Sequence, residues 1–395
     1  MKIDKRKPSH WVQLLLFAAQ VAIAIVLRPF RRRGTSKHVV LYGHKLTGNL
    51  WAIYQHLVAR CGRDIMVTFL TMDKPYHRQL VAQGIASVSA TSFACQRLLR
   101  RTEVIISDHG LHVLSALLGR PGIGFVDVWH GFGFKGHHYD DFRVLRRYDE
   151  VWVDSPLQRS FYVEHFGFAP ERVIATGYAR IDALVRRVAD RVALRRRFGL
   201  PETGKVVLFA PTWQHAGLGC GLFPFDVSPE LFYATMAAFA ARTDCVFVTR
   251  AHLNAPIREV NSEPRLRFLP FSEHPDTEAL LLACDVLLAD WSSIVFDWLL
   301  LDRPAIFLDV PPPFPVGSTL QPRHRYGHLV GSMAETVQAL ERYVGRPDDY
   351  TERFGAQAAL IRQEVFGDCA DGYATQRCVK CLEALIASLP KPLRQ

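Results

Sequence analysis

A polar turn between two apolar segments restricts the possible folds of this chain more than any other feature. The turn, residues 290–293 (Asp-Trp-Ser-Ser), follows the apolar segment 286–289 and leads through a short helical pattern to a second apolar segment, 305–308. This pattern predicts two buried parallel strands joined by a helical crossover. The turn then lies at the carboxyl end of a strand, where α/β sheets bind nucleotides. Ser292 and Ser293 are therefore candidate anion ligands, although serines at the start of a helix also act as simple caps.

The same alternation of apolar segments and helical patterns extends over most of the chain. Strands are predicted at residues 38–42, 64–70, 104–107, 124–129, 150–153, 172–175, 206–210, 246–250, 267–269, 286–289 and 305–308. With 395 residues, the chain is long enough for two α/β domains, each with its own core. We predict two Rossmann-like parallel-sheet domains, at 35–195 and 196–395. This α/β organisation resembles the GT-B architecture, in which two such domains face a cleft.

The net charge of +10 at pH 7 indicates an acidic partner, such as a nucleic acid, an anionic membrane surface or a phosphorylated substrate. Nucleic acid is the least supported, because the sequence has no zinc-finger spacing, RNP-like aromatic strand or obvious recognition helix. The turn at 43–49 lacks the glycine spacing of a dinucleotide site, so no nicotinamide cofactor is expected. No metal is expected either, because Cys378 and Cys381 form one isolated Cys-x-x-Cys, which is more typical of a packed helix face than of a zinc site.

Residues 1–34 form a separate amino-terminal segment. Its apolar part, 11–27, contains only Gln13 and Gln20 as polar residues, and it is short for a membrane span but long for an ordinary core helix. Cations flank it on both sides: Lys2, Lys5, Arg6, Lys7, Arg28, Arg31, Arg32 and Arg33. Positive charge at both ends favours a peripheral, monotopic helix on the cytoplasmic face of the membrane. Two alternatives remain. One is a signal peptide, although arginines stand where its small-residue cleavage site would be, and the other is a helix packed on the protein's own surface.

Polar side chains follow the predicted strands at their carboxyl ends in both halves of the chain. They are Asp108, His109, Trp129, His130, Thr212, Trp213, Arg250, His252 and residues 290–293. Ligands of open parallel sheets bind at this edge. The sequence therefore predicts a binding site made from these turns.

A series of motifs in the order of the chain resembles the CDP-glycerol glycerophosphotransferases, which build teichoic-acid and related capsular polymers. The motifs are Trp129-His130-Gly131 with Lys135, residues 177–182 with Arg180, Ala210-Pro211-Thr212-Trp213, Arg250-Ala251-His252, residues 290–293 with Phe296-Asp297, and residues 371–377. Phe132 and Ala179 depart from the usual threonine and proline of the family. The departures concern the identity of the alditol phosphate and of the acceptor more than the chemistry.

The resemblance implies an enzyme that transfers glycerol phosphate, or a related polyol phosphate, from CDP-glycerol to a hydroxyl of a lipid-linked or polymeric acceptor, with release of CMP. The acceptor hydroxyl must lose its proton, and an imidazole that titrates near neutral pH can accept it. His130 is the candidate base, and His252 is the candidate partner for the donor phosphates and the leaving group. The candidate substrate-binding residues are Arg250, Asp290, Ser292, Ser293, Asp297, Thr212, Lys135 and Arg180.

Two other classes of protein are compatible with the same pattern. A GT-B glycosyltransferase that uses a nucleotide sugar has the same architecture and also needs no metal-binding Asp-x-Asp. A non-catalytic, membrane-bound binding protein could keep the fold, but His130, His252 and the paired serines argue against it. The released nucleotide separates the two enzymes, since CDP-glycerol transfer releases CMP and most sugar donors release a nucleoside diphosphate.

Overall fold

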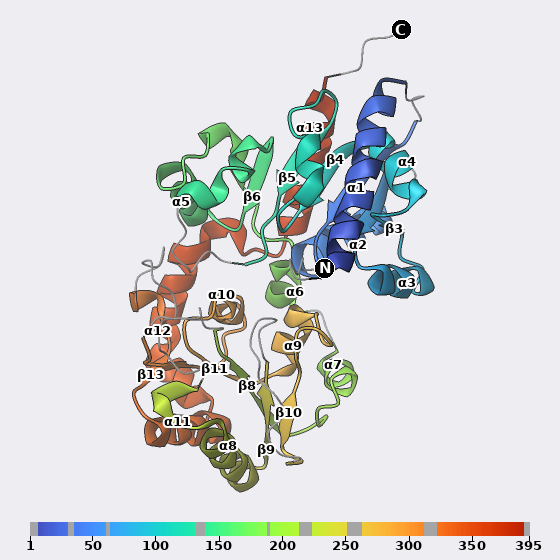
Figure 1. Cartoon of the computed structure of the whole chain (residues 1–395). Coiled ribbons are helices and arrows are strands. Elements are labelled where there is room, and N and C mark those ends of the chain that lie inside the picture. The colour runs from blue at the N-terminus through green and yellow to red at the C-terminus, as the bar shows by residue number, and fades with distance from the viewer. Residues whose placement is uncertain are drawn as a thin grey trace. The chain divides into compact units, whose positions relative to one another are not determined.

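The computed structural model describes residues 7–30, 35–60, 64–131, 139–187, 190–212, 223–250, 263–311 and 322–390 (Figure 1). The chain divides into two compact units. Unit 1 contains Met1–His130, His138–Asp182 and Tyr373–Gln395, and unit 2 contains Gly131–His137 and Ala183–Gly372. The main boundary therefore falls near residue 182 rather than 195, and the last helix belongs to unit 1 rather than to the second domain.

Unit 1 contains a seven-stranded parallel sheet in the order β3-β2-β1-β4-β5-β6-β7. The strands are β1 (Lys37–Tyr42), β2 (Ile65–Thr71), β3 (Ser87–Ser89), β4 (Thr102–Ser107), β5 (Gly124–Asp127), β6 (Glu150–Val153) and β7 (Val173–Ala175). Its main helices are α1 (Pro8–Leu27), α2 (Gly48–Arg60), α3 (Lys74–Ala82), α4 (Phe93–Arg101), α5 (Pro156–Glu164) and α13 (Ala374–Ser388). The helices cover both faces of the sheet, as expected where strands are apolar on both sides.

The period-2 alternation of β1 assigns its side chains to two apolar cores. Val40 packs into the core that includes Phe17 of α1. Val39 and Leu41 point to the opposite face and pack into the core that includes Leu382 of α13. Neighbouring positions of one strand are therefore buried by helices that are almost the whole chain apart in sequence.

Unit 2 contains a six-stranded parallel sheet in the order β10-β9-β8-β11-β12-β13. The strands are β8 (Lys205–Ala210), β9 (Cys245–Thr249), β10 (Leu266–Phe268), β11 (Val286–Ala289), β12 (Ala305–Leu308) and β13 (His328–Val330). The main helices are α7 (Arg191–Arg197), α8 (Pro229–Thr243), α9 (Thr277–Ala283), α10 (Ile294–Leu299), α11 (Met333–Gly345) and α12 (Asp348–Phe366). Two parallel-sheet α/β units confirm the predicted fold class.

Helix α13 returns to unit 1 because its first turn is bound there by side chains. The carboxylate of Asp182 accepts hydrogen bonds from Ala374 N at 2.9 Å and Thr375 N at 2.8 Å, which are unpaired donors of the helix start. Arg377 Nε donates to the carbonyl oxygen of Thr176 at 2.7 Å. The motifs at 177–182 and 371–377 thus join distant parts of one unit. Cys378, one turn further on, is buried in the same core, as expected for a packed helix face.

Helix α1 packs along unit 1 beside α4 (Figure 1). Phe17, Val21 and Ala24 are buried on its inner face. Arg28, at the end of the helix, is also buried, and its guanidinium donates to the carbonyl oxygens of Leu99 at 2.9 Å and Thr102 at 2.8 Å. Arg28 therefore fixes the helix to the protein and does not serve as a flanking cation.

The outer face of α1 is apolar and exposed. Leu15 and Val26 are 69% and 66% exposed, and Trp11 and Phe30 are also exposed. By length and composition, residues Pro8–Phe30 could cross a membrane. One face of the helix is thus packed on the protein's own surface, and the opposite face is apolar and exposed.

Candidate functional site

The turn after β5 holds His130, and its backbone is unusual. Trp129 has a φ of 44°, a left-handed conformation that is rare for a bulky residue. Asp127 Oδ1 accepts a hydrogen bond from Trp129 N at 2.9 Å. Asn49, in the first turn of α2, donates from Nδ2 to the carbonyl oxygens of Val128 and Trp129, at 2.8 and 3.1 Å. The backbone that precedes His130 is therefore held in place by two buried side chains.

The imidazole of His130 is exposed and has a defined hydrogen bond at one nitrogen. Its Nδ1 lies 3.0 Å from the carbonyl oxygen of Asp108, which only accepts, so Nδ1 carries the proton and Nε2 keeps its lone pair. Although the residue as a whole is exposed, the groups packed around its ring, and after them the nearby His109, lower the pKa of His130. The imidazole is therefore neutral at pH 7. An unprotonated Nε2 is what a general base requires.

His130 belongs to a stack of aromatic rings. The His109 ring lies parallel to it, with centroids 4.4 Å apart and planes 9° apart, and the Trp129 ring stacks on it at 4.7 Å. His44 contacts His109 with a centroid distance of 4.4 Å. Asp108 Oδ1 binds His109 Nδ1 at 2.7 Å. These residues follow β1, β4 and β5, which are adjacent in the sheet, so the strand order explains why they meet.

Arg180, a candidate substrate-binding residue, lies within electrostatic range of His130. Its backbone N–H donates to Asn49 Oδ1 at 3.1 Å, so one asparagine links the β5 turn to the segment that carries Arg180. The guanidinium is mostly buried and lies over the Tyr178 ring at 5.5 Å. Its charge is among those that lower the pKa of His130. Unit 1 therefore brings two of the predicted site residues together.

Asn49, Asp127 and His44 are not among the residues expected from the sequence. His44 lies in the turn that follows β1 and Asn49 in the first turn of the next helix, α2, so both follow a strand's carboxyl end as Asp108 does. Asp127 is the last residue of an apolar strand, and a buried carboxylate at such a position has to be hydrogen-bonded within the fold. Position at a strand's carboxyl end is therefore the signal in the sequence, and it applies to the turn after β1 as well.

In unit 2, Thr212 and Asp290 follow the adjacent strands β8 and β11 and bind each other. Thr212 N donates to both carboxylate oxygens of Asp290, at 2.8 and 3.0 Å, and its hydroxyl donates to Oδ1 at 2.6 Å. Burial raises the pKa of Asp290, and the bonds from Thr212 oppose that rise. The pair ties two strand ends together, and contact of either residue with a substrate stays a prediction.

The two serines lie at the start of α10. Ser293 immediately precedes the helix, and its side chain makes no capping hydrogen bond. Ser292 and Ser293 are both half-buried. The structure therefore gives the Ser293 hydroxyl no role as a cap. Asp297, in the first turn of α10, is buried.

Arg250 follows β9 and is buried. Its guanidinium donates to the carbonyl oxygen of His274 and to Thr277 Oγ1, both at 2.8 Å. Burial lowers the pKa of Arg250 to about 10, so it stays charged at neutral pH. In this structure the cation braces the start of α9. His252 and Lys135, the other cationic or titratable candidates, lie outside the described residues.

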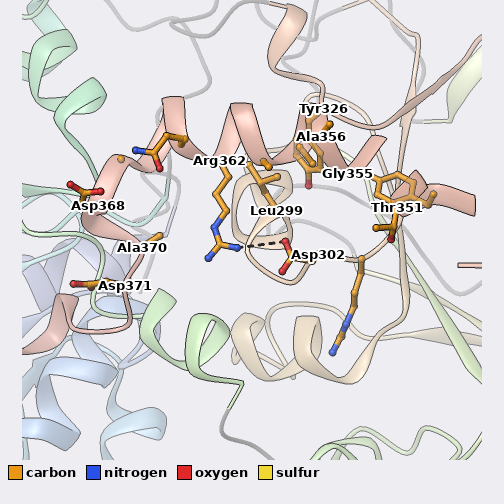
Figure 2. A pocket seen from close by; sticks show the side chains of 16 residues that line it. Leu299, Asp302, Tyr326, Thr351, Gly355, Ala356, Arg362, Asp368, Ala370 and Asp371 are labelled. Atoms are coloured by element: carbon orange, nitrogen blue, oxygen red, sulfur yellow. Dashed lines mark ion pairs between the residues drawn. The ribbon is translucent and has the colours of Figure 1, made fainter. Parts of the chain in front are cut away.

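A cavity of about 830 Å³ lies in unit 2 between the end of α10 and α12 (Figure 2). Figure 2 shows Asp302 and Arg362 facing each other in it, with Arg362 Nη1 3.5 Å from Asp302 Oδ1. Asp368 and Asp371 lie at one end of the cavity. Among its lining residues in the described part of the chain is none of the candidates named from the sequence. The cavity is therefore separate from the strand-end residues described above.

Comparison with known proteins places these features in a family. A family model described as CDP-glycerol:poly(glycerophosphate) glycerophosphotransferase matches residues 25–383. A teichoic acid poly(ribitol-phosphate) polymerase of Bacillus spizizenii is 26% identical over 359 residues, which cover 85% of this chain and 54% of that protein. A teichoic acid glycerol-phosphate transferase of Staphylococcus aureus is 24% identical over 288 residues, which cover 65% of this chain and 70% of that protein.

Among solved structures, the wall teichoic acid polymerase TagF matches with a TM-score of 0.74 and 18% identity, over 96% of this chain and 98% of that chain. At this identity the likeness concerns the fold. The chain spans about half the length of the first curated relatives, 44% of one and 54% of another. The match thus covers nearly all of this chain but only part of those proteins.

Proposed function

Since the chain belongs to the CDP-glycerol:poly(glycerophosphate) glycerophosphotransferase family, we propose that it transfers a polyol phosphate from a CDP-activated donor to a hydroxyl acceptor and releases CMP. The donor is CDP-glycerol or a close CDP-polyol, because the relatives act in both glycerol-phosphate and ribitol-phosphate synthesis by name. The acceptor is a lipid-linked or polymeric saccharide or polyol phosphate. The observation that carries this proposal is the orientation of His130, whose Nδ1 is committed to the Asp108 carbonyl.

In this proposal His130 Nε2 removes the proton from the acceptor hydroxyl. The hydroxyl oxygen forms a bond to the polyol-bearing phosphorus, and the bond from that phosphorus to the CMP oxygen breaks. A general base contributes roughly 10²–10⁴-fold to such a step. The low pKa of His130 favours the neutral base at physiological pH.

Unit 2 holds the donor in this proposal. Ser292 and Ser293 lie at a helix start, where hydroxyls and backbone N–H groups suit phosphate oxygens. Further residues bind the donor substrate or the acceptor substrate in this proposal, because they lie in the family motifs. They are His252, Arg250, Lys135 and Arg180. The Thr212–Asp290 pair supports the arrangement by fixing the turn that carries the serines.

The released nucleotide tests the proposal. The full-length protein is incubated with an extract of polymer precursors and, in separate reactions, with CDP-glycerol, CDP-ribitol and a panel of nucleotide sugars. CMP release from a CDP-polyol, dependent on the acceptor, supports polyol-phosphate transfer. Release of a nucleoside diphosphate from a sugar donor would replace it with a GT-B glycosyltransferase, and no turnover of any donor would favour a binding protein.

We also propose that α1 lies along the cytoplasmic membrane surface, with its apolar outer face in contact with lipid. The inner face and Arg28 are committed to unit 1, which supports a helix that lies in the membrane plane over one that spans it. The exposed strip with Leu15 and Val26 provides the apolar contact. The lysines and arginines at 2–7 and 31–33 supply positive charge for an anionic surface.

A further inference from the structure

Asp108 makes two different hydrogen bonds that converge on two stacked histidines. Its carbonyl oxygen faces His130 Nδ1 at 3.0 Å, and its Oδ1 faces His109 Nδ1 at 2.7 Å. The carboxylate is nearly buried, with 8% of the side chain exposed. One residue therefore sets the proton position on His130 and the ring orientation on its neighbour.

The stack restricts the plane of the His130 ring. Its centroid lies 4.4 Å from that of His109, and the two planes differ by 9°. The ring of Trp129 also stacks on it, at 28°. Rotation of the imidazole about its own side-chain bonds would break these contacts and remove Nδ1 from the Asp108 carbonyl. The stacked rings and the carbonyl thus restrain the same rotation.

The loop after β1 leaves room for this arrangement. A Cβ on Gly43 would collide with Asp108 Oδ1 and would also approach Leu50 Cδ1 at 2.8 Å. A side chain at position 43 would therefore push the carboxylate away from His109. His44, the next residue, contacts the far part of the stack through His109. The glycine is explained by the approach of the carboxylate rather than by a turn.

We propose that Asp108 and His109 are positioning residues for His130, which hold its ring in the plane and tautomer that leave Nε2 directed to the acceptor hydroxyl. This inference rests on the proposed role of His130 as the base. In the transfer step His130 gains a proton on Nε2 and becomes an imidazolium, while its Nδ1–H bond to Asp108 is kept. The ring therefore does not have to move during the reaction.

The test uses the full-length protein with His109→Ala, His109→Phe and Gly43→Ala. His109→Ala removes the stacked ring, His109→Phe keeps a flat ring without the bond to Asp108, and Gly43→Ala displaces the carboxylate. His165→Ala, an exposed histidine of the same unit, is the matched control. The readouts are kcat, the donor KM and the ¹⁵N chemical shifts of the His130 ring nitrogens, which report the tautomer without any turnover.

We expect His109→Ala to lower kcat by about tenfold, part of the 10²–10⁴-fold that a base contributes, with the donor KM unchanged. The ¹⁵N shifts of Nδ1 and Nε2 should move toward each other as the tautomers mix. His109→Phe should lose less activity, Gly43→Ala should resemble His109→Ala, and His165→Ala should match the wild type. Unchanged kcat and unchanged ¹⁵N shifts in His109→Ala would overturn the proposal. If His130→Ala keeps full activity, the role as base is wrong, while the ¹⁵N shifts still decide whether His109 positions the ring.

Discussion

The two units use the same position in a parallel sheet for different chemistry. In unit 1, the turns after β1, β4 and β5 bring histidine rings together, and Nε2 of His130 carries no proton. In unit 2, the turns after β9, β8 and β11 contain a buried cation and a half-buried acid, both hydrogen-bonded within the unit, and half-buried hydroxyls at a helix start. Strand order brings residues together in both cases. The side chain that follows each strand decides whether the edge suits proton transfer or anion binding.

The sharpest test of this contrast is His130→Ala in unit 1. If unit 1 supplies the base, kcat should fall by about 10²–10⁴-fold, and donor affinity should stay nearly unchanged. Steady-state kinetics and direct donor binding by calorimetry measure the two effects separately. His165→Ala should behave as the wild type. A loss of donor affinity that matches the loss of kcat would move His130 from the acceptor side to the donor side.

The outer face of α1 offers a second distinction, because only unit 1 has a proposed membrane contact. The double variant Leu15→Glu with Val26→Glu should weaken binding to anionic vesicles by about 100-fold, since full burial of such a side chain stabilises by roughly 1.5–3 kcal/mol. Vesicle co-sedimentation measures this, and soluble-donor binding should not change. Leu360→Glu, an exposed apolar position on α12 of unit 2, is the control. Equal loss of vesicle binding in the control would mean that the contact is not specific to α1.

In unit 2, the variant Ser292→Ala with Ser293→Ala should weaken donor affinity by at least tenfold. Each hydrogen bond to a charged group contributes roughly 1.5–3 kcal/mol, so the loss of one suffices. Ser332 provides a matched serine, because its hydroxyl caps α11 by accepting from Glu335 N at 3.2 Å. Ser332→Ala should cost about 1 kcal/mol of folding stability and leave donor binding intact. Wild-type donor affinity in the double variant would exclude the serines from the donor site.

The smallest expected effect is on the pH dependence of stability, through Asp127, whose carboxyl group holds the turn after β5. Burial raises the pKa of Asp127 well above its usual range, so the folded protein binds this proton more tightly than the unfolded chain, which titrates near pH ~4. Its contribution to stability is present at low pH and is lost as the pH rises through the raised pKa. Asp127→Asn keeps an acceptor for Trp129 N but removes the titrating carboxyl. The free energy of unfolding of this variant should therefore fall less between pH 5 and 8 than that of the wild type. Urea denaturation at several pH values measures this, with the exposed Asp64→Asn as control. Parallel pH profiles for Asp127→Asn and the wild type would contradict the prediction.

Much of the fold could be predicted because buried parallel strands are continuous apolar segments. The strands at 38–42, 206–210 and 286–289 appear where expected. The exceptions are the three-residue edge strands β3, Ser-Val-Ser, and β13, His-Leu-Val, which are not predicted because each begins with a polar residue and is too short to show a pattern. The place of α13 could not be predicted either, because its bonds to Asp182 join residues that are 192 and 193 positions apart.

The candidate site could be predicted only at the level of strand ends. Position and residue type identified His130 and the serines, but not which polar groups are already bound within the fold. Arg250 and Asp290 looked like ligands, and the structure commits both to internal hydrogen bonds. Helix α1 shows the same limit, because Phe17 and Leu15 look alike in an apolar sequence although one is buried and the other exposed.

The return of α13 to unit 1 has a consequence for synthesis of the protein on the ribosome. Unit 2 is encoded as an insertion between two parts of unit 1, so it can finish folding while the first unit still lacks a helix. Until α13 emerges, the parts of α2 and β4 that pack against it lack that contact. The part of unit 1 that is made before unit 2 therefore waits for a helix that is made after it, and a chain that stops before residue 373 should leave unit 1 open to chaperones and proteases.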